Sequence, residues 1–125
     1  MAVHIRRVDY FYVNVRDQPG EAYKLLTLLA ARRINLLAFT AVPTGEARAQ
    51  LTIFPDDPQH LISEARNAAL TLDGPYHALL VQGDDELGAL ADLHHQLYDA
   101  GVNVYAASGV ADGRARFRLS DLHPA

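Results

Sequence analysis

Apolar and polar residues alternate with two different periodicities along this chain, and each periodicity predicts one kind of secondary structure. Alternation with a period of two predicts a strand over residues 8–16, and the residue types at 34–42 also suit a strand, with 47–54 as its hairpin partner. Apolar residues spaced three and four apart predict a helix that follows Gly20 and reaches about Arg33, and a second helix over 58–70. The first part of the chain therefore has the predicted order βαββα.

The second part of the chain shows the same two periodicities. The pattern predicts a strand over 76–82, a helix over 86–100, and strands over 102–110 and 115–119. Asp112 and Gly113 form the turn between the last two strands, as residues of these types commonly do. This part therefore has the predicted order βαββ.

Turn residues and core residues of the first part recur 68 positions later, without a gap (85 − 17 = 68). The recurring pairs are Asp17 and Asp85, Gly20 and Gly88, Asn35 and Asn103, Gly45 and Gly113, Leu25 and Leu93, Leu29 and Leu97. Such self-similarity predicts two copies of one supersecondary unit. We assign residues 1–75 to the first repeat and 76–125 to the second, which ends before an equivalent of the 58–70 helix.

The predicted architecture is α+β and ferredoxin-like, with the helices on one face of an antiparallel sheet. The expected strand order across the sheet is 34–42, 47–54, 8–16, 76–82, 115–119 and 102–110. The first and last of these strands would be unpaired edges without Lys or Pro inside them, and such edges favour pairing with another chain. We therefore expect a homodimer that forms through edge strands.

Composition excludes several classes of function. The 125 residues are half hydrophobic, which suits one compact domain or two very small ones, and the net charge of −4 argues against a general attraction to nucleic acid or to anionic membranes. The chain has no cysteine, so thiol chemistry and disulfides are excluded. No apolar run has the length of a spanning helix or of a signal peptide, and we expect a cytoplasmic protein without membrane contact.

Two segments of the chain resemble the ACT domains, which are small βαββαβ regulatory modules that bind amino acids. The segments are VNVRDQPGEAYKLLTLLAARRINLLAFTA and VQGDDELGALADLHHQLYDAGVNVYAA, each a strand, an acidic turn ending in glycine, a helix, and a strand that starts apolar-Asn-apolar. The resemblance covers nearly the whole chain as a tandem pair. It implies a non-enzymatic regulatory or sensor protein that holds an amino acid between modules and acts on an enzyme or another regulator.

By this resemblance the ligand contacts come from the strand-to-helix turn of one module and from the second-strand start of another. The positions that match are Asp17, Gln18, Pro19, Gly20 and Asn35, and, in the second copy, Asp85, Glu86, Leu87, Gly88 and Asn103. A helix N-terminus suits the ligand carboxylate, and Asp and Asn oxygens suit its ammonium group. The second copy departs from the family pattern because Leu87 stands where proline is usual.

Purely structural explanations of the same residues stay open. Asp17 has the residue type of an N-cap for the first helix, and Asn35 has that of a left-handed helix end. On this alternative the chain is an interaction protein with vestigial ligand sites, and no amino acid would stabilise it.

A third hypothesis is a sheet that stacks single-stranded RNA bases. Basic and aromatic residues alternate along strands in a way that places them on the sheet face away from the helices. They are Arg48, Arg114, Arg116, Arg118, Tyr10 and Tyr12, and Leu80 shares the same face. The same residues could anchor a dimer interface instead.

No catalytic motif occurs in the sequence. The patterns of zinc hydrolases, of nucleophile elbows and of phosphate-binding loops are all absent, so we expect no enzyme activity. The histidines are not spaced as metal ligands, and we expect no cofactor and no metal ion.

Overall fold

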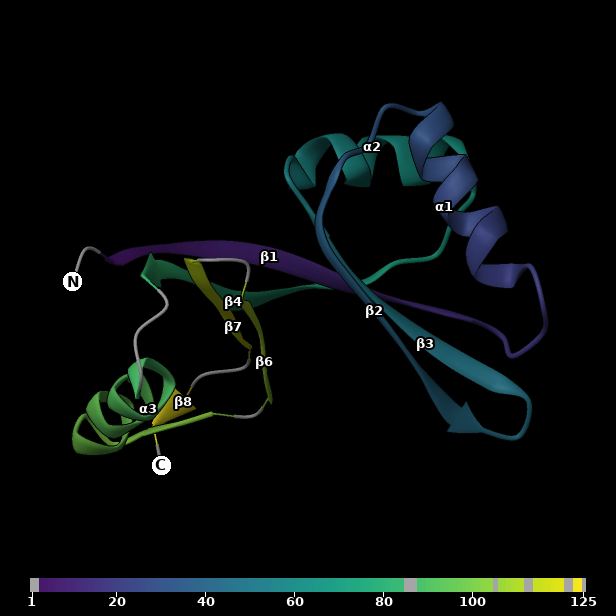
Figure 1. Cartoon of the computed structure of the whole chain (residues 1–125). Helices are drawn as coiled ribbons and strands as arrows, with labels where there is room; N and C mark the ends of the chain where they lie inside the picture. Colours follow the sequence, from purple (N-terminus) through teal and green to yellow (C-terminus); the bar gives the residue numbers. More distant parts are fainter. Residues whose placement is uncertain (1–2, 85–87, 105, 112–113, 121–122, 125) are drawn as a thin grey trace. The chain divides into compact units, whose positions relative to one another are not determined.

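The computed structural model describes residues 3–84, 88–104, 106–111, 114–120 and 123–124. These described residues form three helices and eight strands, with the order shown in Figure 1. The elements are β1 (Val3–Arg16), α1 (Glu21–Ala31), β2 (Leu36–Gly45), β3 (Arg48–Pro55), α2 (Pro58–Asn67), β4 (Asp73–Asp84), α3 (Ala89–Asp99), β5 (Val102–Asn103), β6 (Ala106–Ala111), β7 (Arg114–Ser120) and β8 (His123–Pro124). The fold is α+β, and its first six elements have the βαββαβ order of ferredoxin-like folds.

The chain divides into two compact units. One unit, which we call the central unit, is Asp9–Pro75. The other contains both chain ends, Met1–Val8 and Tyr76–Ala125, and we call it the terminal unit. The strand β1 contributes to both units, so the assignment of repeats 1–75 and 76–125 stays a prediction from the sequence.

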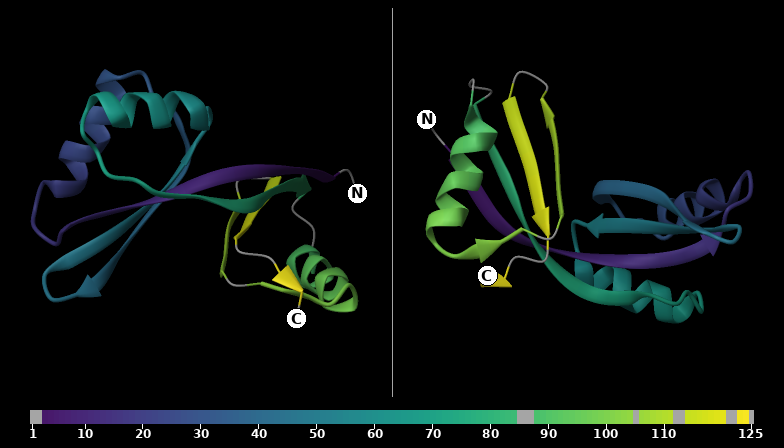
Figure 2. Two further views of the ribbon diagram at one scale, coloured as in Figure 1. Left: turned by 180° about the vertical axis from the view of Figure 1, so that it is seen from behind. Right: turned by 90° about the horizontal axis from the view of Figure 1, so that it is seen from below.

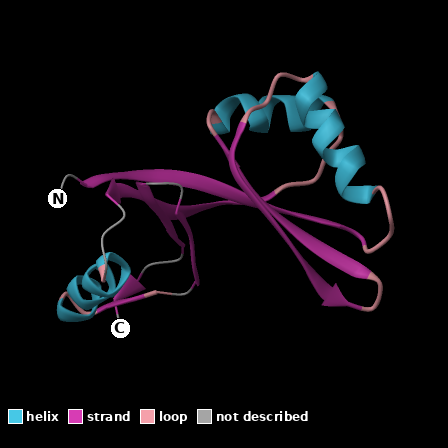
Figure 3. Cartoon of the chain, in the orientation of Figure 1, coloured by secondary structure: helices cyan, strands magenta, loops and turns pink. Residues whose placement is uncertain are grey.

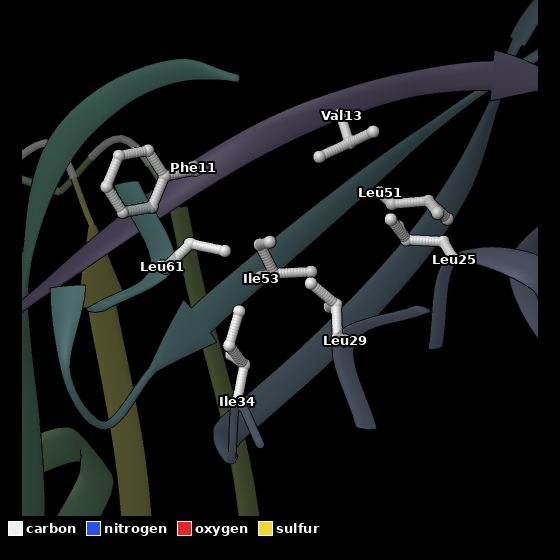
Figure 4. Close-up of a cluster of buried hydrophobic side chains, with 8 residues drawn as sticks. All are labelled: Phe11, Val13, Leu25, Leu29, Ile34, Leu51, Ile53 and Leu61. Carbon is white, nitrogen blue, oxygen red and sulfur yellow. The ribbon is translucent and has the colours of Figure 1, made fainter. Parts of the chain in front are cut away.

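The central unit is a sheet of β2, β3 and β1 in that order, covered by α1 and α2 (Figures 1 and 3). Both strand pairs are antiparallel. Its core lies between the sheet and the two helices, where eight buried side chains meet (Figure 4). They are Phe11, Val13, Leu25, Leu29, Ile34, Leu51, Ile53 and Leu61. The odd-numbered residues of β1 and β3 thus face the helices, as the period of two predicts.

The terminal unit continues the sheet order with β1, β4, β7 and β6. The β4–β7 and β6–β7 pairs are antiparallel, and the right view of Figure 2 shows the three strands side by side. The predicted strand 102–110 is wrong in one respect, because it is split into β5 and β6, and β5 pairs with β8 in a separate two-stranded sheet. Within the described residues, no helix combines the length and hydropathy that a membrane crossing requires.

The helices α1 and α3 start and end at positions that differ by 68 (89 − 21 = 68 and 99 − 31 = 68). Each follows a glycine in the left-handed region, Gly20 at φ 88° and Gly88 at φ 81°. Each also ends before a left-handed residue, Arg33 at φ 60° and Gly101 at φ 71°. The spacing found in the sequence is therefore present in the backbone of these two helices.

The connection from β2 to β3 differs from its prediction. The predicted strands 34–42 and 47–54 leave residues 43–46 between them, but β2 continues through Gly45, and Glu46 and Ala47 make the turn with φ 49° and 59°. The edge strand β2 therefore contains Pro43, so the expectation of an edge without Pro is wrong. Two consecutive positive φ angles are the geometry of a type I′ turn, which matches the twist of a hairpin. This turn brings Ala47 next to Asp17, which precedes α1, and the two residues form a backbone hydrogen bond.

Candidate ligand-binding site

The turn before α1 is an exposed loop held at one point to the β2–β3 hairpin. The Asp17 backbone N–H donates to the Ala47 carbonyl at 2.7 Å, and Asp17, Gln18, Pro19 and Gly20 are all exposed. The prediction of Asp17 as N-cap is wrong, because α1 begins at Glu21 and the cap position belongs to Gly20. Gly20 fits there because its φ of 88° is strained for any residue with a Cβ.

The N-terminus of α1 has backbone N–H groups that can bind an anion. Among the described residues no side chain caps this helix, but the Glu21 N–H donates to the Gln18 carbonyl at 3.3 Å, which leaves the N–H groups of Ala22 and Tyr23 to solvent or to a ligand. Two exposed cations, Arg16 and Arg48, are cross-strand partners at the sheet end beside the turn. The helix N-terminus and these two cations suit a carboxylate, while the acidic residues Asp17 and Glu21 at the same turn oppose it.

Asn35 lies just before β2 and is fixed by Asp56, which follows β3. The Asn35 Nδ2 donates to Asp56 Oδ2 at 3.3 Å, and the Asp56 backbone N–H donates to the Asn35 carbonyl at 3.0 Å. Both side chains are exposed. The left-handed residue at the end of α1 is Arg33, so the alternative in which Asn35 itself takes that conformation is wrong.

Within the central unit, the two groups of predicted ligand residues lie at opposite ends of α1. The turn Asp17–Gly20 precedes this helix and Asn35 follows it, and 11 helical residues span about 16 Å. The carboxylate and ammonium of one amino acid are only a few ångströms apart. The structure thus does not bring Asp17 and Asn35 of one unit together around a single ligand.

In the second copy the structure describes only part of the predicted set. Gly88 is the exposed, left-handed N-cap of α3, again without a side-chain cap among the described residues. Asn103 is exposed and lies opposite His123 in the short β5–β8 ladder. Asp85, Glu86 and Leu87 lie outside the described residues.

A polar junction joins the end of α1 to α2 close to Asn35 in the sequence. Arg32 Nη1 lies 2.9 Å from Glu64 Oε2, and His60 Nε2 donates to the Arg32 carbonyl at 3.0 Å. Asp57 caps α2 by accepting from the His60 backbone N–H at 3.2 Å. These bonds fix the C-terminal end of α1, the end nearest to Asn35, against α2.

One aromatic residue of the predicted RNA-stacking face, Tyr10, does not lie on an open surface. Tyr10 is only 1% exposed and packs against Phe54, with ring centroids 5.1 Å apart. A buried ring cannot stack on a base, so the prediction that Tyr10 lies on an open platform is wrong.

Among the described residues there is no group of three or more His, Asp or Glu that could hold a metal ion.

Comparisons with known proteins show which solved structures have a similar fold. No family model and no curated protein matches the sequence. Among solved structures, the chain is similar to protein BT0572 from Bacteroides thetaiotaomicron, at 15% identity and a TM-score of 0.80, over 94% of this chain and 81% of that one. It is also similar to the ligand-free regulatory subunit of aspartate kinase from Thermus thermophilus, at 17% identity and a TM-score of 0.68, over 96% and 87% of the two chains.

The chain has the ACT fold. A second aspartate kinase regulatory subunit, from Thermus flavus, supports this, at 17% identity and a TM-score of 0.58 over 95% of this chain and 84% of that one. At these identities the likeness establishes the ACT fold alone. The resemblance that the sequence motifs indicated is confirmed at the level of fold.

Asp56 is the residue near the candidate site that sequence reasoning missed. It lies 21 positions from Asn35 and reads in the sequence as part of the Pro55–Pro58 break before α2. The signal that could have found it is strand pairing, since the end of β3 must return to the start of β2 in an antiparallel hairpin.

Proposed function

We propose that the chain is a non-enzymatic regulatory or sensor protein that binds an amino acid where two ACT-like modules meet. The observation that carries the proposal is the exposed turn Asp17–Gly20, which leads into a helix without a side-chain cap among the described residues. In an ACT fold this turn offers backbone N–H groups to a carboxylate. The likeness to regulatory subunits of aspartate kinase supports a regulatory role over a catalytic one.

The chain is, in this proposal, a tandem pair of ACT-like repeats. The support is the common spacing of 68 residues in the bounds of α1 and α3 and in their left-handed flanking residues. Among the described residues after α3, the elements are the strands β5, β6, β7 and β8. Its turn residues Asp85, Glu86, Leu87 and Gly88, with Asn103, form the second candidate ligand set.

A homodimer through the edge strand β2 completes the site. Asn35 directly precedes β2, so a copy that pairs along this edge brings a second Asn35 and a second turn to the interface. The ligand would lie between the turn of one copy and Asn35 of the other. Asp17 and Asn35 of one copy, which lie at opposite ends of α1, then need not contact the same ligand. Binding of one ligand by two copies then favours the paired state and passes that preference to a regulated partner.

A thermal-shift screen of the common L-amino acids tests the function. We expect at least one amino acid to raise the melting temperature by several degrees at saturating concentration, because a ligand that binds only the folded state stabilises it. Asp17→Ala and Asn35→Ala should each remove most of this shift, whereas Asn67→Ala, at an exposed position at the end of α2, should keep it. No shift with any amino acid would favour an interaction protein with vestigial sites.

A further inference from the structure

The side-chain amide of Asn35 has two chemically different ends, and the structure gives them different surroundings. Nδ2 faces Asp56 Oδ2 at 3.3 Å. The backbones of the same two residues are joined by the bond from the Asp56 N–H to the Asn35 carbonyl at 3.0 Å. Asp56 therefore holds Asn35 through both its backbone and its side chain.

The chemistry of a carboxylate allows only this orientation of the amide. An ionised carboxylate accepts hydrogen bonds and donates none, while an amide presents two donors at Nδ2 and two lone pairs at Oδ1. A flipped amide would set Oδ1 against the Asp56 oxygens, and these acceptors would repel each other. Asp56 thus directs the Asn35 Oδ1 away from itself.

We propose that Asp56 is a positioning residue that presents the Asn35 Oδ1 to the ammonium group of a bound amino acid and adds negative charge beside it. The inference rests on the proposed function and names the part of the ligand that Asn35 recognises. Both side chains are exposed, so an ammonium group can reach them. Arg32, a nearby cation in the sequence, is already paired with Glu64 at 2.9 Å.

The neighbouring residue Asp57 has a different task. Its side chain accepts from the His60 N–H at the start of α2 and makes no part of the Asn35 contact. Asparagine caps a helix about as well as aspartate. Asp56→Asn and Asp57→Asn therefore remove the same charge from adjacent positions, but only the first removes the carboxylate that orients Asn35.

The first measurement reads the amide directly and needs no ligand. In a ¹H–¹⁵N spectrum, the side-chain NH₂ resonances of Asn35 should move clearly in Asp56→Asn and stay near their wild-type positions in Asp57→Asn. An unchanged Asn35 amide in Asp56→Asn, or equal changes in the two variants, would overturn the positioning role.

The second measurement reads recognition of the ammonium group. Calorimetry compares each stabilising L-amino acid with its deaminated analogue, for example L-alanine with propionate or L-valine with isovalerate. Asp56→Asn should lower the preference for the amino acid over its analogue roughly tenfold, since one charge-assisted contact is lost. Asp57→Asn should keep the preference within about twofold.

The two measurements separate failure of the inference from failure of the proposed function. If no amino acid binds the wild type, the proposed function and the ammonium subsite both fail, while the Asn35 spectrum still decides the positioning role. If an amino acid binds and Asp56→Asn leaves its preference intact, the function stands and the Asp56 inference is wrong.

Discussion

The helices α1 and α3 have equivalent bounds but very different surroundings. In α1, Leu25 and Leu29 are 6% and 2% exposed and belong to the core of the central unit. In α3 no described residue is buried, Leu90 is 44% exposed, and Leu93 and Leu97 are only half-buried. Local sequence signals thus determine where both helices start and end, whereas burial depends on what packs against them.

The second helix of the central unit explains part of this contrast. Leu61 and Ala65 of α2 are buried, and α2 binds the end of α1 through Glu64 and His60. Among the described residues after α3, the elements are strands. The comparison teaches that α3 has the bounds and the left-handed flanking residues of α1 without its packing.

Truncation of equivalent leucines tests the contrast most strongly. Leu29→Ala should lower the free energy of unfolding by about 3 kcal/mol, because it leaves a cavity in a closed core. Leu97→Ala, at the equivalent position (29 + 68 = 97), should cost about 1 kcal/mol, because the side chain is already in contact with solvent. Urea denaturation followed by circular dichroism measures both, and equal losses would contradict the difference between the two helices.

The two sheet edges offer a second comparison. Val42 is 50% exposed on β2, and Val110 occupies the equivalent position of β6 (42 + 68 = 110). Because lysine on an edge strand disfavours pairing, Val42→Lys should weaken the proposed dimer tenfold or more, by about 1.4 kcal/mol. Val110→Lys should leave the molar mass by light scattering at the wild-type value. A wild type that is monomeric at all concentrations would end the dimer proposal.

The helix ends give a third, smaller comparison, in which opposite changes should have opposite effects. Arg33 and Gly101 occupy equivalent left-handed positions, and a Cβ at Gly101 would meet nothing within 4 Å. Gly101→Ala should therefore cost about 1 kcal/mol through backbone strain alone, and Arg33→Gly should gain up to about 1 kcal/mol. Thermal unfolding measures both, and a loss of stability in Arg33→Gly would show that the Arg33 side chain matters more than its backbone.

The ion pairs give the smallest expected effect. Arg32–Glu64 joins two helices at 2.9 Å, whereas His95–Asp99 lies within α3 at 3.4 Å. Glu64→Gln should cost about 0.5 kcal/mol, and Asp99→Asn should be close to neutral, because exposed pairs within one helix contribute little. The cost of Glu64→Gln should shrink at high salt.

The sequence was sufficient for the elements that depend on local rules. Spacing of apolar residues predicted the three helices, but the alternation on β1 did not decide the core, since Tyr10, which was expected on the open face of the sheet, is buried. The order of strands within each unit also follows from the predicted pairing.

The remaining features depend on conformation or pairing that residue type alone does not determine. Asp17 has the residue type of a helix cap, but the left-handed conformation of Gly20 moves the helix start to Glu21. The Asn35–Asp56 contact joins residues 21 positions apart, and it depends on the β2–β3 register, which shifts between Leu36 and Ala38. Strand pairing predicts that the end of β3 meets the start of β2, but the register shift decides which residues face each other there.

Mixing of two inactive variants is the most direct test of a ligand site shared between copies. Asp17→Ala and Asn35→Ala chains should each lose, in calorimetry, the sites that Asp17 and Asn35 form for the amino acid that stabilises the wild type. After unfolding and joint refolding in equal amounts, about a quarter of these sites should return, because half of the dimers are mixed and each mixed dimer has one such site intact. No loss of sites in either variant alone, or no recovery after mixing, would contradict the account.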